Sequence, residues 1–295
     1  MKNFYGQFEP PVDQFIFERY FPNKGIKGTF VECGAFDGLT ECSCKAFEES
    51  MGWKGYNIEP VPWIYERLCQ NRPLSRNLNF ALSNKIGEAT FKAVDHPVLG
   101  KNFGNGSLTH TIDHKAALQE MGCTFQEVQV PLCTWTDFIN KENVTQVDLF
   151  VLDVEGHELS VIEGMQGCEV LPDVICIEVG HLSFDAIRSA LSQLNYIYDI
   201  SSHVNAYFIK SDKLSLFSLR RIDYLQSLLV ENSVSKESFL VENRVLQDRI
   251  STYENIFAEI RCSKAWRVIE LIRRFKATIN YRLLKLNRVN KRKGR

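Results

Sequence analysis

The fold is decided near the start of the chain by the stretch Thr29-Phe30-Val31-Glu32-Cys33-Gly34-Ala35-Phe36-Asp37-Gly38. Its first half, residues 29–33, has the apolar and β-branched character of a buried strand. Its second half is a tight turn with two glycines, which let the backbone adopt positive φ and approach a ligand closely. Because open α/β sheets bind their ligands at the carboxyl ends of strands, we expect a ligand site at 34–38.

This turn is not the dinucleotide-binding fingerprint, which needs three glycines in the order G-x-G-x-x-G, whereas here two stand in G-x-x-x-G. The turn is also acidic, through Glu32 and Asp37, and carboxylates repel a pyrophosphate. They suit a cationic ligand with an amino group and ribose hydroxyls, such as S-adenosylmethionine. Glu59 supports that ligand, because it ends the next expected strand, 27 residues after Glu32, where a carboxylate can accept both ribose hydroxyls. The alternative for Glu59 is a solvated strand end.

Strand-like and helix-like segments alternate over residues 1–212. Strands are expected at 29–33, 55–59, 78–82, 147–153, 173–179, 196–200 and 205–209, and helices at 40–51, 63–71, 159–165 and 184–194. This β-α-β-α order predicts an α/β fold, with a mostly parallel sheet and helices on both faces. The last two strands are typical of a hairpin, which predicts an antiparallel edge.

Four segments of this region resemble one known family. They are Glu32-Cys33-Gly34-Ala35-Phe36-Asp37-Gly38, Ile58-Glu59-Pro60, Ala81-Leu82-Ser83 and Leu152-Asp153-Val154-Glu155-Gly156-His157-Glu158. In order and spacing they resemble the FkbM family of S-adenosylmethionine-dependent methyltransferases. The resemblance extends over about residues 5–210. It implies the class I methyltransferase fold, a Rossmann-like seven-stranded sheet in the order 3-2-1-4-5-7-6 with strand 7 antiparallel.

The resemblance also implies where the cofactor binds. Around its methionine part it implies Glu32, Cys33, Gly34, Ala35, Asp37 and Gly38, and at the ribose Glu59 and Pro60. Near the adenine it implies Ala81, Leu82 and Ser83, and at the rim beside the reactive methyl group Asp153 and Glu155. Most members of the family are assigned as O-methyltransferases that act on sugar or polyketide hydroxyls.

Methyl transfer to a hydroxyl requires alignment with the methyl group and removal of the hydroxyl proton. The sequence leaves the base open between His157, whose imidazole titrates near neutral pH, and Asp153 or Glu155. For His157 the alternative is a cap of the helix that follows. A divalent cation could bind Asp153, Glu155, Glu158 and His157, because hard oxygen ligands plus one histidine permit it. The resemblance does not demand a cation, and no metal site is predicted.

A polar stretch that contains glycine, residues 95–123, follows the third expected strand. An insertion of this length could form a substrate lid that includes His110 and His114, and solvated loop histidines are the alternative. His181 follows the fifth strand and is a candidate for the cleft wall. Trp63 is expected in the core or in the wall of the cleft.

The net charge of −1 hides an asymmetry. Residues 261–295 carry 13 Lys and Arg and one acid, whereas the remaining 260 residues carry 22 Lys and Arg and 35 acids. An acidic body with a basic tail is typical of an enzyme attached to a targeting or partner-binding segment. No run of 18 apolar residues and no signal-peptide core is found, and the nine cysteines are scattered. We therefore expect a cytoplasmic protein, peripheral at the inner face of a membrane if the tail binds there.

Beyond the methyltransferase domain, 1–212, we expect a helical coiled-coil segment at 213–262. Apolar residues follow 3,4 spacing from Ile222 to Ile260, with Asn232, Lys236 and Asn243 as polar exceptions. This pattern favours a coiled coil, and hence a homo-oligomer, over a helix packed back on the domain.

The last segment, 263–295, is expected to form a basic amphipathic helix. With Trp266 at one end it suits an anionic membrane surface. Its Ser263-Lys264-Ala265-Trp266-Arg267 resembles the Ser-x-x-Trp-Arg segment of some bacterial polysaccharide glycosyltransferases and their accessory enzymes, so a polysaccharide-assembly complex is a second candidate partner. Nucleic acid is disfavoured, because no platform of interleaved aromatic residues accompanies the charge.

Together these features predict an S-adenosylmethionine-dependent O-methyltransferase. Its expected acceptor is a glycan or sugar-containing molecule, methylated on a sugar hydroxyl during the biosynthesis of a surface polysaccharide of O-antigen or capsule type. Two other methyltransferase functions stay open, one acting on RNA and one on a small molecule or polyketide. A non-catalytic scaffold that binds the cofactor is the remaining alternative.

Overall fold

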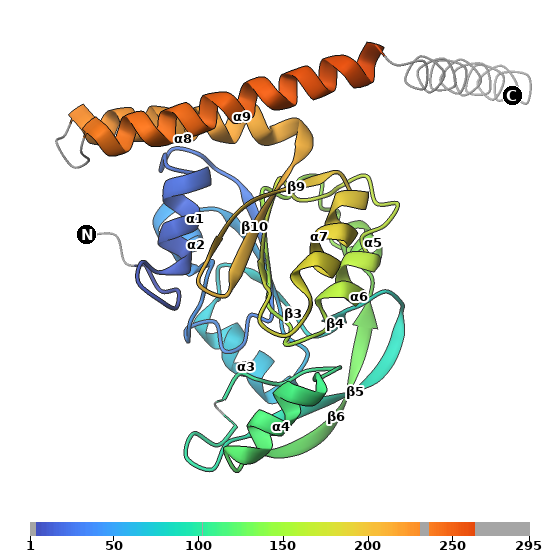
Figure 1. Ribbon diagram of the computed structural model, residues 1–295. Coiled ribbons are helices and arrows are strands. Elements are labelled where there is room, and N and C mark those ends of the chain that lie inside the picture. Colours follow the sequence, from blue (N-terminus) through green and yellow to red (C-terminus); the bar gives the residue numbers. More distant parts are fainter. Residues whose placement is uncertain (1–3, 102, 231–235, 263–295) are drawn as a thin grey trace, which may run out of the picture. The chain divides into compact units, whose positions relative to one another are not determined.

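A seven-stranded sheet lies between helices in the computed structural model, which describes residues 4–101, 103–230 and 236–262 (Figure 1). The strands are β1 (Thr29–Cys33), β2 (Lys54–Ile58), β3 (Arg76–Leu78), β7 (Leu149–Leu152), β8 (Val174–Glu178), β9 (Tyr196–Ser202) and β10 (Asn205–Lys210). They lie side by side in the order β3-β2-β1-β7-β8-β10-β9. Neighbours are parallel except for β10, which runs antiparallel to β8 and β9. This confirms the predicted class I methyltransferase topology, including its antiparallel edge.

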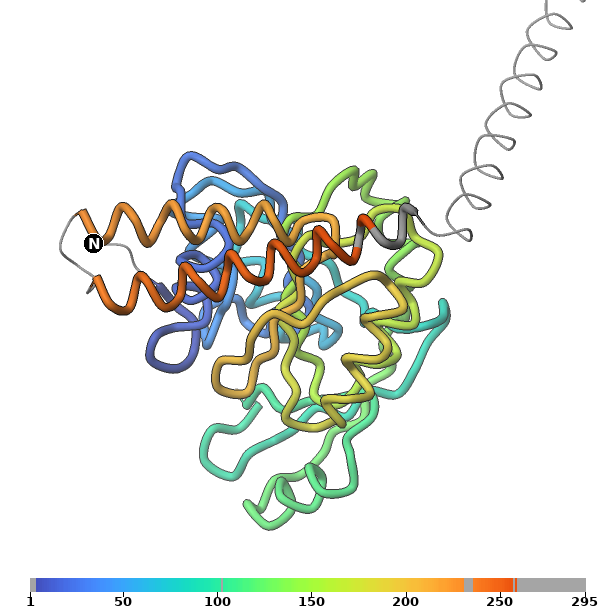
Figure 2. Tube along the Cα trace, turned by 45° about the horizontal axis from the view of Figure 1, so that its top comes forward, coloured from blue at the N-terminus to red at the C-terminus, as the bar shows by residue number. Residues whose placement is uncertain are grey.

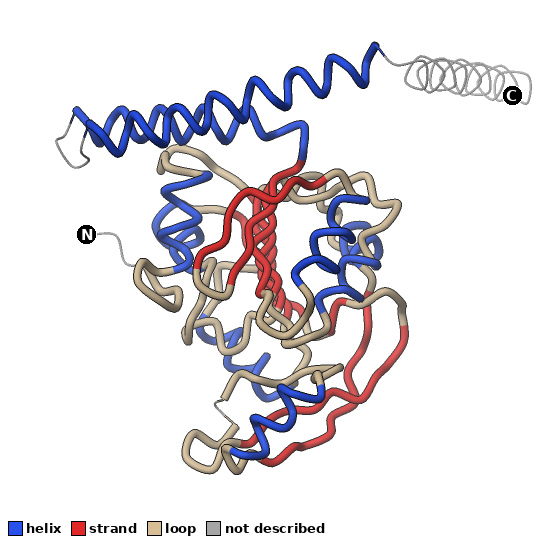
Figure 3. Tube along the Cα trace, in the orientation of Figure 1, coloured by secondary structure: helices blue, strands red, loops and turns tan. Residues whose placement is uncertain are grey.

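Helices cover both faces of this sheet (Figure 3). One group is α1 (Val12–Tyr20), α2 (Lys45–Met51) and α3 (Pro62–Asn71), and the other is α5 (Trp135–Lys141), α6 (Glu158–Glu163) and α7 (Phe184–Gln193). Alternate residues of a strand point to opposite faces. Val31 and Cys33 therefore join the core formed with α5, α6 and α7, whereas Phe30 and Glu32 face the other side.

The helix predicted from Thr40 begins only at Lys45. Two carboxylates explain the delay, because they accept backbone N–H groups that a helix would otherwise leave free. Asp37 accepts the N–H of Thr40, and Glu32 accepts the N–H of Cys44. These bonds hold the intervening residues in a loop.

The segment between β3 and α5 in the sequence forms a second, three-stranded sheet, which was not predicted. It consists of β4 (Ala81–Leu82), β6 (Thr124–Cys133) and β5 (Gly87–Asp95), in that order, and α4 (Ile112–Glu120) lies between β5 and β6. Figure 2 shows this part of the trace, in turquoise to green, projecting from the strands of the main sheet. The single strand predicted over 78–82 is thus divided between the two sheets.

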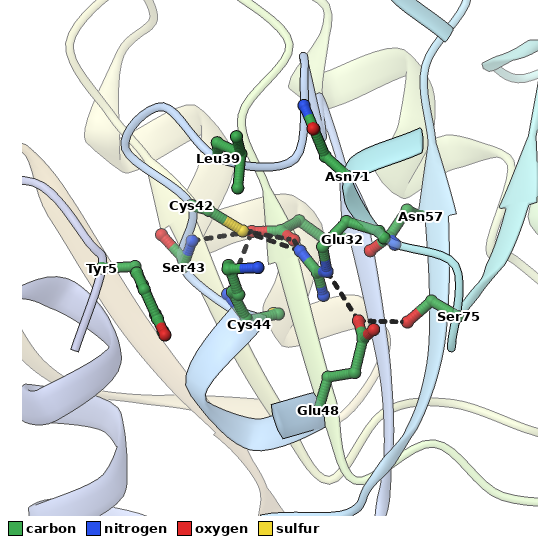
Figure 4. A network of polar contacts seen from close by, with 12 residues as sticks. Tyr5, Glu32, Leu39, Cys42, Ser43, Cys44, Glu48, Asn57, Asn71 and Ser75 are labelled. Carbon is green, nitrogen blue, oxygen red and sulfur yellow. Dashed lines mark hydrogen bonds and ion pairs between the residues drawn. The ribbon is translucent and has the colours of Figure 1, made fainter. Parts of the chain in front are cut away.

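A buried ion cluster joins β1 to α2 and to the end of α3. The guanidinium of Arg72 is fully buried, and its Nε lies 2.6 Å from Glu48 Oε2, while its Nη1 lies 3.3 Å from Glu32 Oε2. Ser75 Oγ donates a further hydrogen bond of 2.5 Å to Glu48. Figure 4 shows Glu32 beside Ser43 and Cys44, with Glu48 and Ser75 next to each other. Every charge of this cluster thus has a partner, as buried charges require.

Two helices, α8 (Leu214–Val230) and α9 (Lys236–Cys262), follow the sheet domain. The chain divides into two compact units at Tyr224/Leu225. The predicted domain boundary at 212 falls in the short 3-10 helix η1 (Ser211–Lys213) that precedes α8.

Four residues of the predicted 3,4 stripe, Ile222, Leu225, Phe239 and Leu246, are buried, whereas Lys236 is exposed. Coiled-coil pairing and an oligomer stay predictions, and the tail at 263–295 lies outside the described residues. Within the described residues, no helix is both long enough and apolar enough to cross a bilayer.

We expect Arg72→Met to lower the free energy of unfolding by about 3–5 kcal/mol, because it leaves two buried carboxylates without a cation. Arg76→Met is the matched control: its side chain is 60% exposed and pairs with Glu142, so its removal should cost less than about 1 kcal/mol. Urea denaturation followed by circular dichroism measures both. Losses of equal size would contradict the structural role given to Arg72.

Candidate active site

A cavity of about 280 Å³ opens where β1, β2 and β7 end, the edge at which parallel sheets bind ligands. Nine of the residues predicted for the site line it: Cys33, Gly34, Glu59, Pro60, Ala81, Leu82, Asp153, Glu155 and His157. They come from segments far apart in the sequence, and the fold brings them together as predicted.

One of these residues, Gly34, must be glycine. Gly34 has a φ of +87°, and a Cβ atom placed on it would lie 1.8 Å from the carbonyl oxygen of Asp153. No other residue permits so close an approach of the chain after β1 to the chain after β7. This contact forms the floor of the cavity, where Cys33, Gly34 and Asp153 all contribute to the lining.

Five residues predicted for the cofactor do not line the cavity: Glu32, Ala35, Asp37, Gly38 and Ser83. Glu32 belongs to the Arg72 ion cluster, because strand alternation turns it to the face opposite Cys33. Asp37 accepts N–H groups of its own turn. Gly38 packs against Arg72, with a Cβ position only 2.5 Å from Arg72 Cγ. In the structure, Glu32, Asp37 and Gly38 thus support the loop after β1.

Glu59 is buried and lines the cavity at the end of β2. Its Oε1 accepts the backbone N–H of Val61 at 2.8 Å. Burial and, to a smaller extent, the nearby Asp37 raise the pKa of this carboxyl to about 7, whereas the hydrogen bond from Val61 and the charge of Arg67 oppose the shift. A carboxylate so placed can accept hydrogen bonds from a ligand that enters the cavity.

The remaining walls are largely apolar, and most of them were missed in the sequence. They include Phe36, Trp63, Phe91, Phe103 and Leu108. Trp63 was expected in the core or the cleft wall, and it lies in the wall, with Lys101 Nζ 4.8 Å from its ring centroid. The indole Nε1 of Trp63 has no hydrogen-bond partner among the described residues. Phe103 and Leu108 belong to the stretch predicted as a lid, and that stretch does line the cavity.

His157 lies between two hydroxyl groups. Its Nε2 is 3.0 Å from Ser83 Oγ and its Nδ1 is 3.0 Å from Thr109 Oγ1. Burial lowers the pKa of His157 to about 4, so the ring is neutral at physiological pH. It does not cap α6 through its side chain. Because both ring nitrogens already have partners, His157 is held as a fixed part of the wall.

The rim beside Asp153 carries a cluster of acids and histidines. Carboxylate oxygens of Asp153, Glu155 and Glu178 lie within 4.8 Å of one another, and so do ligand atoms of Glu155, His114 and His181. Burial raises the pKa values of Glu155 and Glu178 to about 7. The pKa of Asp153 is raised well above its ordinary value, first by desolvation of its carboxyl group by the surrounding protein and then by the negative charge of Glu178.

The set of possible cation ligands named from the sequence is therefore only partly brought together. Asp153 and Glu155 are in the cluster, but His157 is not, and the Oε1 of Glu158 accepts the backbone N–H groups of Val154 and Gly156. His114, expected in the lid stretch, and His181, expected at the cleft wall, lie in the cluster with Glu155.

Two of the solved structures similar to the chain are described as methyltransferases. The FkbM methyltransferase of Methylobacillus flagellatus KT is 14% identical with a TM-score of 0.40, and the alignment covers 65% of this chain and 47% of that one. The chain thus spans less than half of that protein. The TehB-like SAM-dependent methyltransferase of Corynebacterium glutamicum is 10% identical with a TM-score of 0.36, covering 68% and 86%.

The N-terminal domain of human METTL16, in complex with SAH, is 10% identical with a TM-score of 0.35, covering 67% and 65%. No curated protein sequence matches the chain. The model of the methyltransferase FkbM domain, by contrast, matches residues 32–198, more than half of the sequence. The chain therefore belongs to the FkbM family of S-adenosylmethionine-dependent methyltransferases.

Proposed function

We propose that this chain transfers a methyl group from S-adenosylmethionine to a sugar hydroxyl during the synthesis of a surface polysaccharide. The observation that carries the methyltransferase part is the cavity at the ends of β1, β2 and β7, with buried Glu59 on one side and Asp153 on the other. The sugar acceptor is supported by the family resemblance and by the Ser-x-x-Trp-Arg segment at 263–267.

The residues of the cavity fit the cofactor. Gly34 lets the chain after β1 approach the chain after β7 at the cavity, and Glu59 offers a carboxylate for the two ribose hydroxyls. Ala81 and Leu82 offer apolar surface of the kind that an adenine ring needs, and Trp63 has an indole N–H without a partner among the described residues. When bound, the cofactor supplies a methyl group on a sulfonium, which is already a good leaving group.

The chain must therefore orient the acceptor hydroxyl and remove its proton. Asp153 is exposed to the cavity, whereas both ring nitrogens of His157 are already bonded to hydroxyls. This geometry favours Asp153 as the proton acceptor. His157 would then have a structural role, in which its ring joins Ser83 to Thr109 through hydrogen bonds.

Binding of S-adenosylhomocysteine tests the cofactor site. We expect Glu59→Gln to weaken it roughly 10- to 100-fold, because a carboxylate that accepts ligand hydroxyls is worth about 1.5–3 kcal/mol. Glu66→Gln is the control, since Glu66 is an exposed acid on the neighbouring α3. Isothermal titration calorimetry measures both variants. Equal affinity in Glu59→Gln and wild type would remove Glu59 from the cofactor site.

The same binding should depend on pH through Glu59. Its pKa of about 7 in the free protein means that it is largely protonated below pH 7, whereas ribose hydroxyls favour the ionised form. Affinity should therefore fall as pH falls, by roughly tenfold between pH 8 and pH 6, with proton release on binding below pH 7. Calorimetry in two buffers of different ionisation enthalpy detects the proton. The dependence should vanish in Glu59→Gln, and its persistence there would assign it to another group.

Methyl-labelled cofactor tests the acceptor class. Incubation with lipid-linked or polymeric surface glycan should place the label on an O-methyl sugar that acid hydrolysis releases. Asp153→Asn should lower this transfer at least about 100-fold through loss of the base, and His157→Asn by less than about tenfold. Label in RNA instead of glycan would contradict the proposed acceptor. A larger loss in His157→Asn than in Asp153→Asn would reverse the assignment of the base.

A further inference from the structure

Three side chains from separate segments meet at the rim of the cavity. Glu155 follows β7, His181 follows β8, and His114 lies in the first turn of α4. His181 Nε2 is 2.8 Å from Glu155 Oε2, and His114 Nδ1 is 3.8 Å from the same oxygen. The two imidazoles are stacked, with ring centroids 3.9 Å apart and planes 8° from parallel. One nitrogen from each ring thus faces one carboxylate oxygen.

The surroundings of His114 leave this nitrogen available. Its Nε2 lies 3.2 Å from Asn105 Oδ1, which accepts a hydrogen bond from the N–H at that position, so the lone pair of the neutral ring is on Nδ1. The side chain is 6% exposed, and Nδ1 has no hydrogen-bond partner among the described residues. A ring oriented by a hydrogen bond at one nitrogen, with the other nitrogen free, is the usual arrangement of a metal-binding histidine.

Carboxyl groups also gather at this point. Asp153 and Glu178 lie with Glu155, whose Oε2 pairs with His181, and Oε2 of Glu178 lacks a hydrogen-bond partner among the described residues. Within the described part of the chain, the ion pairs of Glu155 and Glu178 involve only His114 and His181. Buried carboxylates are expected to be paired or to coordinate a metal.

The backbone is also held in an unusual conformation at this point. Glu155 has a φ of +57°, in the left-handed region that a glutamate rarely adopts, and Gly156 follows with a φ of +101°. A Cβ on Gly156 would lie 2.9 Å from the carbonyl oxygen of Thr109, so the chain after β7 and the loop before α4 approach closely. Such strain persists where the surrounding structure requires it and is concentrated at functional sites.

We propose that His114, Glu155 and His181 bind one divalent transition-metal ion at the cavity wall, with Glu178 as a further carboxylate ligand. Two imidazole nitrogens beside carboxylates suit Zn²⁺, Mn²⁺, Fe²⁺ or Co²⁺, whereas Mg²⁺ and Ca²⁺ prefer sites built from oxygen alone. Because Asp153 and Glu155 line the cavity, the ion has access to the ligand space.

The ion then binds the hydroxyl oxygen of the acceptor, an assignment that rests on the proposed function. It acts as a Lewis acid that favours the deprotonated oxygen. The oxygen forms a bond to the methyl carbon as the S–CH₃ bond breaks, the electron pair of that bond stays on sulfur, and the hydroxyl proton passes to Asp153. The products are the methyl ether and neutral S-adenosylhomocysteine, and the oxidation state of the ion does not change.

Cobalt binding to the full-length protein, after removal of metals with EDTA, tests the site. We expect about one equivalent of Co²⁺ to bind with visible d–d absorption, to be displaced by Zn²⁺ and to resist an excess of Mg²⁺. His181→Ala and Glu155→Gln should each weaken binding by roughly 100-fold or more, since loss of a supporting residue alone costs 10- to 100-fold. His203→Asn removes an exposed histidine outside the cluster and should change nothing. Circular dichroism verifies that each variant is folded.

Several outcomes would overturn the site. They are no bound cobalt, equal binding in Glu155→Gln and wild type, or a thiolate-to-cobalt charge-transfer band, which would assign the ion to cysteines. Calorimetry with S-adenosylhomocysteine on the same metal-free samples separates the two proposals. Cofactor binding without cobalt binding removes the metal site alone, whereas cobalt binding without cofactor binding removes the proposed function and leaves the metal site in place.

Discussion

A guanidinium without solvent contact holds the end of β1 to α2 and to the end of α3. Arg72 binds Glu32 and Glu48, and Gly38 packs directly on its side chain. Removing three charges from water is costly, so the cluster exists only in the one arrangement that pairs them all. That arrangement fixes the path of the chain from residue 34 to residue 44. Because Gly34 begins that path against Asp153, the cluster indirectly sets the floor of the cavity.

The order of the main sheet could be predicted, since alternating strands and helices allow few topologies and the family resemblance chose among them. The role of Glu32 could not. Because Val31 and Cys33 are apolar, strand alternation already indicated that Glu32 points to the opposite face of the sheet. The residue that decides its role, Arg72, is 40 residues away in the sequence. The three-stranded sheet was missed for a related reason. The strands β5 and β6 pair although a long segment of sequence separates them. The strand β4 has only two residues, too few for a periodic pattern of apolar residues.

Residues that are close in the sequence are only in part close together in the candidate site. Asp153 and Glu155 do lie at the rim, as the motif after β7 indicated. His157, from the same motif, turns instead toward Ser83 and Thr109, because the chain at 155–156 has left-handed backbone angles that change its direction. The rim histidines, His114 and His181, come from two other segments, and only the parallel pairing of β7 with β8 brings His181 near.

The loop before α4 contributes to the cavity wall and leads into the rim cluster. It supplies Phe103 and Leu108 to the cavity wall, and at its end α4 supplies His114 to the rim cluster. A change that moves Phe103 and Leu108 to accommodate another acceptor would therefore also move His114 Nδ1 relative to Glu155. An acceptor that displaces the loop would lose the His114 contact, whereas one that fits beneath it would keep the cluster intact. Acceptor selection in this chain would then follow from the assembly of the rim as much as from the shape of the cavity.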